Sequence, residues 1–415
     1  MFKRVSGTRD ILPDQSGWWQ NIAGTSRTIF SSYNYKEIRP PLLEEAALFN
    51  RSLGENTEIV QKQMFIIKRD EDVFALRPEG TASVVRAYLE NSLDKTLGFA
   101  KLYYMGPMFR AERPQKGRLR QFHHIGCETI GSFGPLIDIE VIALADALLR
   151  AFGITGYTVC LNSLGCAQDK ENLHDFLKKS LKDRLPQLCV DCRDRYDRNV
   201  LRILDCKNES CQKICAELKI GHAHLCRECA EHFAQVRQGL DDLHIAYTVM
   251  PQLVRGLDYY NRTVFEFKHP GLGPQQDALG AGGRYDGLVK ELGGPDLGAI
   301  GFAFGVERLA LVFPVSDQQQ TSDLVYLITL GDQARKQSMT LLSGLRAAGI
   351  PSDTDFEERS LKGAMRKAND LGARFVLILG DDELAKNIVT VKNMKDSSQF
   401  QVAFAELAAY LKKSL

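Results

Sequence analysis

The sequence contains no run of about eighteen apolar residues, the length that a membrane-spanning helix needs. Its first ten residues, MFKRVSGTRD, also lack the apolar core of a secretory signal peptide. We therefore expect a cytoplasmic protein without a membrane segment. Net charge is nearly absent as well, because 53 Lys and Arg residues are matched by 52 Asp and Glu residues. Any surface for nucleic acid must then be a local patch, since no global basic field exists.

Two common nucleotide-binding signatures are also missing. No GxxxxGK[ST] phosphate-binding loop occurs. The glycine pair of AGGRYDGL, residues 281–288, lacks the third glycine of a GxGxxG fingerprint, and we interpret it as leading into a turn and a helix. An enzyme that uses ATP without either signature must bind the nucleotide on another scaffold. The 415 residues, 44% of them hydrophobic, suffice for two or three domains.

Cysteine is abundant, but it is confined to one part of the chain. Nine of the ten cysteines lie between Cys160 and Cys229. Residues 166–235 are charged and helical in pattern and lack the strand signals of their neighbours, so we predict a helical insertion there. In a reducing compartment metal binding or free thiols are favoured over disulfides.

Two CxxC pairs within the insertion predict a metal site. Each pair supplies two thiolates from a short turn, and four thiolates suit one tetrahedral zinc ion. The candidate ligands are Cys189, Cys192, Cys226 and Cys229. Other donors compete with this set, the stronger ones being Cys206 and Cys211 and the weaker ones His222 and His224. Free cysteines in small helical contacts are the alternative.

The most informative stretch is YYMGPMFRAERPQKGRLRQFHHIGCETIG, residues 103–131. Residues 103–109 and 121–130 predict two long strands, which a turn at 114–117 joins into a hairpin. Arginines lie at its base and cationic residues at its tip. The rigid fork of arginine makes bidentate hydrogen bonds to phosphate oxygens, so the hairpin suits a polyphosphate ligand. A solvated hairpin tip is the alternative interpretation.

The other segments predict a large unit of helices and strands, followed by a smaller α/β unit. In the first part, helices are expected at 15–31, 81–91 and 138–152, strands at 35–43, 157–162 and 246–253, and a hairpin at 65–76. A glycine-rich strand and a helix follow at 298–311. After a polar linker, 318–322, strands are expected at 324–329, 350–354, 375–379 and 388–391, with helices at 334–348, 361–371 and 403–413.

Five of these segments resemble one family. FRAERPQKGRLRQFHHIGCE (109–128) is similar to motif 2 of class II aminoacyl-tRNA synthetases, in the form carried by histidyl-tRNA synthetases. YKEIRPPLL (35–43) resembles motif 1 and GAIGFAFGVERLAL (298–311) resembles motif 3. RGLDYY (255–260) and GGRYDGL (282–288) resemble the two signature stretches peculiar to histidyl-tRNA synthetases, and they are the most specific matches.

The resemblance implies a fold and a division into domains. The catalytic core would be an α+β domain with a mixed, mainly antiparallel sheet, the class II synthetase fold, formed by residues 1–165 and 236–317. Residues 166–235 would be its helical insertion, and residues 322–415 an α/β anticodon-binding domain. The family forms homodimers, in which Pro41 matches the interface proline of motif 1.

The resemblance also implies an activity. A histidine–tRNA ligase activates L-histidine with ATP to histidyl-adenylate, with Mg²⁺ on the β- and γ-phosphates, and transfers it to the 3′ end of histidine tRNA. The alternative is a non-catalytic paralogue, such as the regulatory subunit of ATP phosphoribosyltransferase. Such a paralogue is expected to lack the C-terminal domain and the signature residues, both of which this chain keeps.

Residue roles follow from the same resemblance. The catalytic pair would be Arg110 and Arg255, on opposite sides of the α-phosphate and the carboxylate. ATP would be bound by Arg110, Glu112, Arg118 and Arg308. Histidine would be bound by Glu79, Thr81, Arg110, His124, Glu128, Arg255, Tyr259, Tyr260 and Tyr285. The tRNA acceptor end would meet Arg113, Gln115 and Lys116, and the C-terminal unit offers Lys362, Arg366, Lys367 and Arg374 for phosphate contacts. Family members often carry glutamine where this chain has His124.

Overall fold

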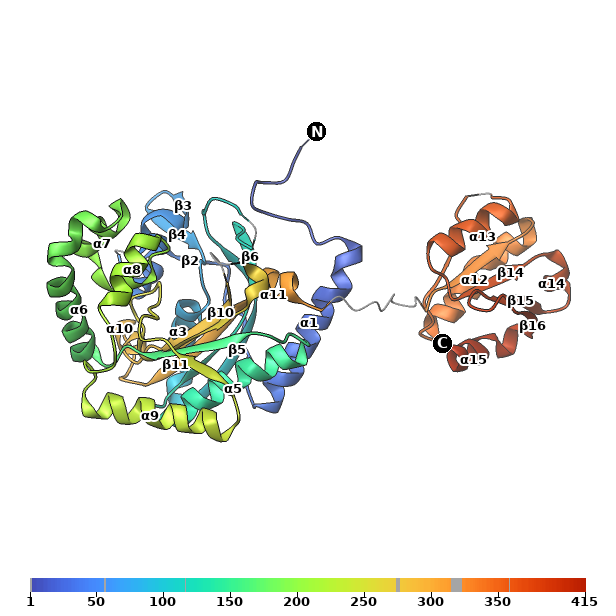
Figure 1. The fold of residues 1–415 in the computed structure, drawn as a ribbon. Helices are drawn as coiled ribbons and strands as arrows, with labels where there is room; N and C mark the ends of the chain where they lie inside the picture. Colours follow the sequence, from blue (N-terminus) through green and yellow to red (C-terminus); the bar gives the residue numbers. More distant parts are fainter. Residues whose placement is uncertain (1, 56, 116, 274–276, 315–322, 358) are drawn as a thin grey trace. The chain divides into compact units, whose positions relative to one another are not determined.

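The computed structural model describes residues 2–55, 57–115, 117–273, 277–314, 323–357 and 359–415 (Figure 1). The chain divides into two compact units, residues 1–314 and 315–415. The predicted linker at 318–322 and the predicted tRNA contact Lys116 lie outside the described residues. None of the helices within the described ranges is both long enough and apolar enough to cross a bilayer.

The first unit is built on a sheet whose described strands follow the order β1-β5-β6-β11-β10-β9-β7-β8. Neighbours from β5 to β7 are antiparallel, whereas β1 pairs with β5 and β7 with β8 in parallel. The expected mixed, mainly antiparallel sheet is confirmed. Its strands are β1 (Lys36–Glu37), β5 (Ala100–Phe109), β6 (Gln121–Ile130), β7 (Thr158–Ser163), β8 (Tyr247–Val249), β9 (Asn261–Lys268), β10 (Ala278–Arg284) and β11 (Ala299–Gly305).

The predicted hairpin is formed by β5 and β6, and its two faces have different neighbours. Alternate residues of a strand point to opposite faces. Ile125 and Cys127 are buried in a core with the apolar helix α5 (Pro135–Ala151). On the other face, Ile130 packs with Val84 and Val85 of α3 (Thr81–Glu90). A hydrogen bond from the Arg110 N–H to the Arg120 carbonyl, 2.9 Å, closes the base of the turn.

Three further helices share the core of α5. They are α1 (Pro13–Ser32), α9 (Arg227–Asp242) and α11 (Val306–Val312). The end predicted for the insertion, residue 235, falls inside α9. Val236 and Leu240, beyond that point on the same helix, are buried against the catalytic core. The C-terminal half of α9 therefore belongs to the core by its packing.

A smaller sheet and short helices accompany α3. The sheet has the order β2-β4-β3, and its β3–β4 hairpin confirms the one predicted at 65–76. These elements are β2 (Leu43–Glu45), α2 (Ala46–Leu53), the π-helical turn η1 (Ile59–Gln63), β3 (Phe65–Arg69), β4 (Asp72–Leu76), α4 (Leu93–Thr96) and α10 (Leu288–Glu291). The short helical turn η4 (Pro270–Leu272) packs instead against α11 and the core of α5.

A buried ion pair joins α5 to the signature stretch GGRYDGL. Arg284 and Asp138 are both fully buried, with 2.7 Å between Arg284 Nε and Asp138 Oδ1. Asp138 also accepts a hydrogen bond from Thr263 Oγ1, 2.6 Å, and Arg284 donates to Asp286 at 2.6 Å. The glycine pair of this stretch lies inside β10, and the predicted turn and helix follow it at residues 286–287 and in α10. Across β10, a Cβ on Gly282 would lie 2.3 Å from the Gly301 carbonyl oxygen, which explains glycine in a strand.

The predicted insertion is helical, and its described residues form no strand. It contains α6 (Ala167–Leu181), η2 (Lys182–Gln187), α7 (Val190–Arg198), η3 (Val200–Asp205) and α8 (Glu209–Glu217). Its core is small and rich in sulfur. Beside leucine, isoleucine and valine it buries Cys192, Cys206, Cys211 and Cys215.

The second unit confirms the predicted α/β pattern. Its described strands follow the order β13-β12-β14-β15-β16, parallel around β12 and antiparallel beyond β14. Its elements are β12 (Val325–Thr329), α12 (Asp332–Ala347), β13 (Ser352–Thr354), α13 (Leu361–Asp370), β14 (Phe375–Leu379), α14 (Asp381–Ala385), β15 (Ile388–Asn393), β16 (Gln399–Ala403) and α15 (Phe404–Ser414). Strand β16 and helix α14 were not predicted.

Candidate active site

A cleft of about 220 Å³ lies over the central strands of the large sheet. Its floor is glycine-rich, with Gly280, Gly301 and Gly305 contributed by β10 and β11. Such strands let a ligand approach the backbone closely. The cleft brings together ten of the predicted site residues from separate segments: Glu79, Thr81, Arg110, Glu112, Arg118, His124, Arg255, Tyr259, Tyr260 and Arg308.

Glu79 is a buried acid at the start of α3. Its carboxylate accepts hydrogen bonds from the backbone N–H groups of Thr81, at 2.6 Å, and Ala82, at 2.8 Å. Burial raises the pKa of Glu79, while these N–H groups and Arg110 act in the opposite direction. The helix start therefore holds an acceptor that a cationic ligand group can approach.

Glu128 lies beneath the cleft, outside its lining, and is 1% exposed. Three hydroxyl groups donate to its carboxylate: Thr81 Oγ1 at 2.7 Å, Tyr104 OH at 3.2 Å and Tyr285 OH at 2.5 Å. Burial raises the pKa of Glu128 to about 8, although the hydroxyl donors lower it. Tyr285, also predicted for the site, lies beside Glu128 under the cleft.

Four arginines, Arg110, Arg118, Arg255 and Arg308, give the cleft its positive charge. Arg110 donates from Nε to the Pro78 carbonyl at 3.0 Å, and its guanidinium lies 5.3 Å from the centre of the Phe122 ring. Arg308 donates from Nη1 to the Ala278 carbonyl at 2.7 Å. Burial lowers the pKa of both arginines, although each stays far above neutral pH because arginine is in practice always charged. Backbone contacts thus hold these two cations without neutralising them, as an anion site requires.

Arg255 is held by a carboxylate instead. Its Nη1 lies 2.9 Å from Glu266 Oε1, and its Nε is buried without a hydrogen-bond partner among the described residues. The insertion contacts the same loop, because Asn199 donates to Asp258 Oδ1 at 3.1 Å. Lys170 of α6 also donates to the Asp258 and Tyr260 carbonyls, at 3.1 and 2.9 Å. The loop that carries Arg255 is therefore held by Glu266 of the large sheet and by Asn199 and Lys170 of the insertion.

The two adjacent histidines of β6 have different environments. His124 lines the cleft, and its buried Nδ1 has no hydrogen-bond partner in the described part of the chain. Burial, and then the charges of Arg110 and Arg308, hold the pKa of His124 well below its usual range. Its imidazole is consequently neutral near pH 7. His123 points the other way, and its backbone N–H and Nδ1 both lie 2.9 Å from Glu307.

Several predicted residues lie outside the cleft. Arg113 and Gln115 are exposed on the hairpin turn. In the second unit, Lys362 and Arg366 are exposed and Lys367 pairs with Asp355 at 3.3 Å. Arg374 donates to the carbonyls of Ser414 and Leu415, at 2.6 and 2.8 Å, so its guanidinium supports the chain end.

Among the cleft residues that were not predicted, Tyr104, Phe122 and Glu266 contact predicted ones. Tyr104 and Glu266 contact predicted site residues, and Phe122 lies under Arg110. Strand alternation gave a signal for Glu266, the one acid among the apolar residues of VFEF. Tyr104 and Phe122 had no such signal, because an aromatic residue in a strand is normally predicted to be part of the hydrophobic core.

The predicted zinc set was wrong in its pairing. Cys189 and Cys192 lie with Cys206 and Cys211, and their sulfur atoms are within 4.8 Å of one another. Cys226 and Cys229 lie in a second group, with Cys166 and Asp169. The reason is that Cys226 and Cys229 begin α9, which packs on the catalytic core, whereas Cys189 and Cys192 begin α7 in the core of the insertion.

Known proteins match both units of the chain. Residues 7–309 match the family model described as histidyl-tRNA synthetase, and residues 324–414 match the anticodon binding domain. A histidine–tRNA ligase from Halothermothrix orenii is 44% identical, covering 99% of each chain. One from Geobacter metallireducens is 44% identical, covering 97% of each. The crystal structure of the apo histidyl-tRNA synthetase of S. aureus has a TM-score of 0.82 and 35% identity, and covers 99% of this chain and 100% of that one.

Proposed function

The chain belongs to the histidyl-tRNA synthetase family and is a histidine–tRNA ligase, and we propose how the side chains of its cleft carry out that reaction. The enzyme consumes ATP, and its second unit is an anticodon-binding domain. A non-catalytic paralogue is disfavoured, because full-length relatives are ligases and the chain keeps both signature stretches. The observation that carries the proposal is the convergence of Arg110, Arg255 and Arg308 on one cleft beside Glu79.

In the first half-reaction, the histidine carboxylate attacks the α-phosphate of ATP and pyrophosphate leaves. Such a displacement is accelerated mainly by positioning and by stabilisation of the developing charge. Arg110 and Arg255 bind the α-phosphate and the carboxylate, and Glu266 orients Arg255. Arg308, Arg118 and Glu112 bind the remainder of the nucleotide. Because backbone carbonyls fix Arg110 and Arg308 in advance, no reorganisation is needed when the negative charge develops.

Magnesium fits the same end of the cleft. Glu112 lines the cleft with a carboxylate that is 15% exposed and contacts Arg118 through one oxygen, at 3.1 Å. Mg²⁺ typically binds substrate phosphates and only one or two protein carboxylates. Glu112 is thus the residue that would hold it, and the ion would neutralise charge on the β- and γ-phosphates.

Histidine is recognised at the other end of the cleft. Glu79 and Thr81 bind the α-ammonium group, while Glu128, Tyr260 and Tyr285 contact the imidazole. Tyr259 closes the side of the pocket, with its ring centre 5.6 Å from that of Tyr285. The neutral His124 takes the place of the glutamine common in the family, since an imidazole also has one donor and one acceptor. A site built from such polar partners rejects amino acids that cannot pair with them.

Transfer to tRNA and dimer formation are supported by separate surfaces. The exposed turn residues Arg113 and Gln115, with Lys116, contact the acceptor end of histidine tRNA. The homodimer forms through motif 1, where Arg77 Nη1 fixes the Pro40 carbonyl at 2.8 Å and holds the proline pair in place. We expect the dimer to work in the cytoplasm.

ATP–pyrophosphate exchange with each of the twenty amino acids tests the proposal. Histidine should support exchange, and the others should give no more than background. Equal exchange with another amino acid, or none with histidine, would contradict the assigned roles. Sedimentation of the purified protein tests the dimer independently of activity.

A further inference from the structure

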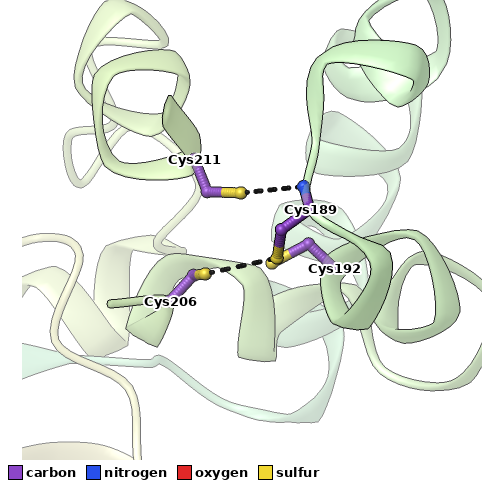
Figure 2. A group of neighbouring side chains, drawn as sticks. All are labelled: Cys189, Cys192, Cys206 and Cys211. Atoms are coloured by element: carbon purple, nitrogen blue, oxygen red, sulfur yellow. Dashed lines mark hydrogen bonds between the residues drawn. The ribbon is translucent and has the colours of Figure 1, made fainter. Parts of the chain in front are cut away.

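The insertion contains a cluster of four cysteines that the ligase reaction does not use. Cys189 and Cys192 come from the start of α7, Cys206 follows η3, and Cys211 lies in α8. Figure 2 shows the four side chains converging from these segments. Cys192, Cys206 and Cys211 are buried, and Cys189 is half-buried. Four donors from three helical segments therefore meet at one point inside the insertion.

The distances within the cluster suit a metal ion. All four sulfur atoms lie within 4.8 Å of one another, and Cys189 Sγ and Cys206 Sγ are 3.8 Å apart. In a regular tetrahedron with zinc–sulfur bonds of about 2.3 Å, neighbouring sulfurs are about 3.8 Å apart. All four cysteines are free thiols, so no disulfide accounts for their convergence. The spacing is that of a closed four-sulfur site.

Backbone N–H groups donate to two of the four sulfur atoms. The Cys189 backbone N–H donates to Cys211 Sγ at 3.3 Å, and the Asn208 N–H donates to Cys206 Sγ at 3.4 Å (Figure 2 shows the first of these). Hydrogen bonds of this kind orient metal ligands and offset their negative charge. Cys189 also occupies the N-cap of α7, where the helix dipole favours an anion.

The second cysteine group is less suited to a metal. Its Asp169 already accepts hydrogen bonds from the backbone N–H groups of Cys226, at 2.8 Å, and Cys166, at 3.2 Å. The carboxylate thus joins the starts of α6 and α9, and Cys226 is exposed. A closed structural site of four thiolates is a common arrangement for zinc, whereas three cysteines with an already engaged aspartate are not.

We propose that Cys189, Cys192, Cys206 and Cys211 bind one structural zinc ion that holds the insertion together. The insertion buries only a small apolar core, and a metal then supplies the free energy that such a core lacks. Bound zinc would fix both ends of the segment that contains η3, because Cys192 precedes η3 and Cys206 follows it. Asn199, just before η3, donates a hydrogen bond to Asp258 of the stretch RGLDYY, residues 255–260. The ion therefore also stabilises the loop that carries Arg255.

Metal analysis of the full-length protein, purified without added metal, tests the site. Wild type should carry about one zinc per chain, and Cys206→Ser and Cys211→Ser should each lose it. The matched controls are Cys226→Ser, from the second group, and Cys215→Ser, a buried cysteine beside the cluster. Both controls should keep the zinc. Zinc lost from Cys226→Ser but kept in Cys206→Ser would overturn the assignment.

Two measurements on wild type keep the test independent of whether the variants fold. Replacing zinc with Co²⁺ should give the thiolate-to-cobalt charge-transfer band and the visible bands of a tetrahedral four-sulfur site. Alkylation of the native protein, mapped by mass spectrometry, should spare these four cysteines until a mercurial releases the metal. A zinc-free protein in which Cys189 and Cys206 alkylate as fast as the exposed Cys226 would exclude the site.

Discussion

Glu128 and Gly301 face each other directly across the ladder between β6 and β11. A Cβ on Gly301 would come within 1.9 Å of Glu128 Oε2 and 2.4 Å of the Cys127 carbonyl oxygen. Because the second atom belongs to the backbone, the strand itself would have to move. The bare Cα of Gly301 is what leaves room for the Glu128 carboxylate under the cleft floor.

The first prediction concerns histidine specificity. Glu128→Ala should raise the KM for histidine far more than the KM for ATP, because the imidazole loses its buried acceptor. Pyrophosphate exchange at varied histidine and varied ATP measures both constants. Tyr104→Phe is the matched control, since it removes one hydroxyl donor to Glu128 and should have a smaller effect. Equal increases in both KM values would mean that Glu128 only supports the structure.

The second prediction concerns Arg255. Arg255→Ala should leave a folded protein and lower activation by at least about 100-fold, the scale expected for one preorganised charge contact. Single-turnover formation of histidyl-adenylate gives the rate. The control is Arg227→Ala, which removes an exposed arginine from α9 and should leave the rate unchanged. Activity of Arg255→Ala within tenfold of wild type would remove Arg255 from the α-phosphate.

The third prediction is a pH dependence of stability. The pKa of Glu128 is raised from 4.5 to about 8 in the folded protein, so the native state holds this proton more tightly than the unfolded chain does. The free energy of unfolding should therefore fall as pH rises between these two values. Glu128→Gln cannot titrate and should lose this part of the fall. Urea unfolding of unliganded wild type and variant across that range checks it, and parallel curves would refute the shift.

The fourth prediction separates hydrogen bonding from charge at position 124. His124→Gln should keep exchange within about tenfold of wild type, because an amide also offers a donor and an acceptor. His124→Leu should lose about ten- to a hundredfold, corresponding to one polar contact worth about 1–3 kcal/mol. Because the pKa of His124 is held well below its usual range, its own ionisation should add no step to the pH profile between about 6 and 8. A leucine variant as active as the glutamine variant would show that His124 makes no polar contact.

The fifth prediction addresses the buried ion pair. Arg284→Met should destabilise the first unit by about 3 kcal/mol, because Asp138 would keep a buried charge without its arginine, with only His232 at 2.8 Å and Thr263 at 2.6 Å as hydrogen-bond partners. Arg150→Ala, which removes the exposed partner of Asp146 on the same helix α5, should cost about 0–1 kcal/mol. Urea unfolding measures both. Similar losses for the two variants would indicate that the Arg284 pair contributes little.

The sequence predicted most of the fold because hydrophobic periodicity is a local signal. Helix α5 and strands β5 and β6 were located to within a few residues on that basis. Strand 246–253 was overestimated, since only Tyr247–Val249 pairs with β7 before the chain turns. Strand β16 was missed although it pairs with β15 directly before it, because its five residues are too short for a clear periodic pattern.

The sequence predicted which residues belong to the site, but not which of them line the cleft and which lie buried beneath it. Glu128 and Tyr285 were expected to bind histidine with Glu79, yet they lie beneath the cleft lining. Thr81 and Tyr104, which do line the cleft, donate hydrogen bonds to the Glu128 carboxylate behind them, a tertiary contact that the sequence does not show. The cysteine pairing failed for a similar reason. Spacing along the chain cannot show that α9 leaves the insertion and packs on the catalytic core.

The hydrogen bond between Arg110 and Arg120 at the base of the hairpin marks the boundary between a turn that tolerates changes in length and a strand that does not. The tip of the turn, between Glu112 and Arg118, can gain or lose residues without moving β6, whereas those two residues line the cleft and are kept in place. A single insertion within β6 is not tolerated in the same way, because a slip of one residue turns every side chain to the opposite face. It would put Cys127 under the cleft and bury Glu128 against α5. Insertions and deletions among relatives should therefore occur in the turn and not in the strand.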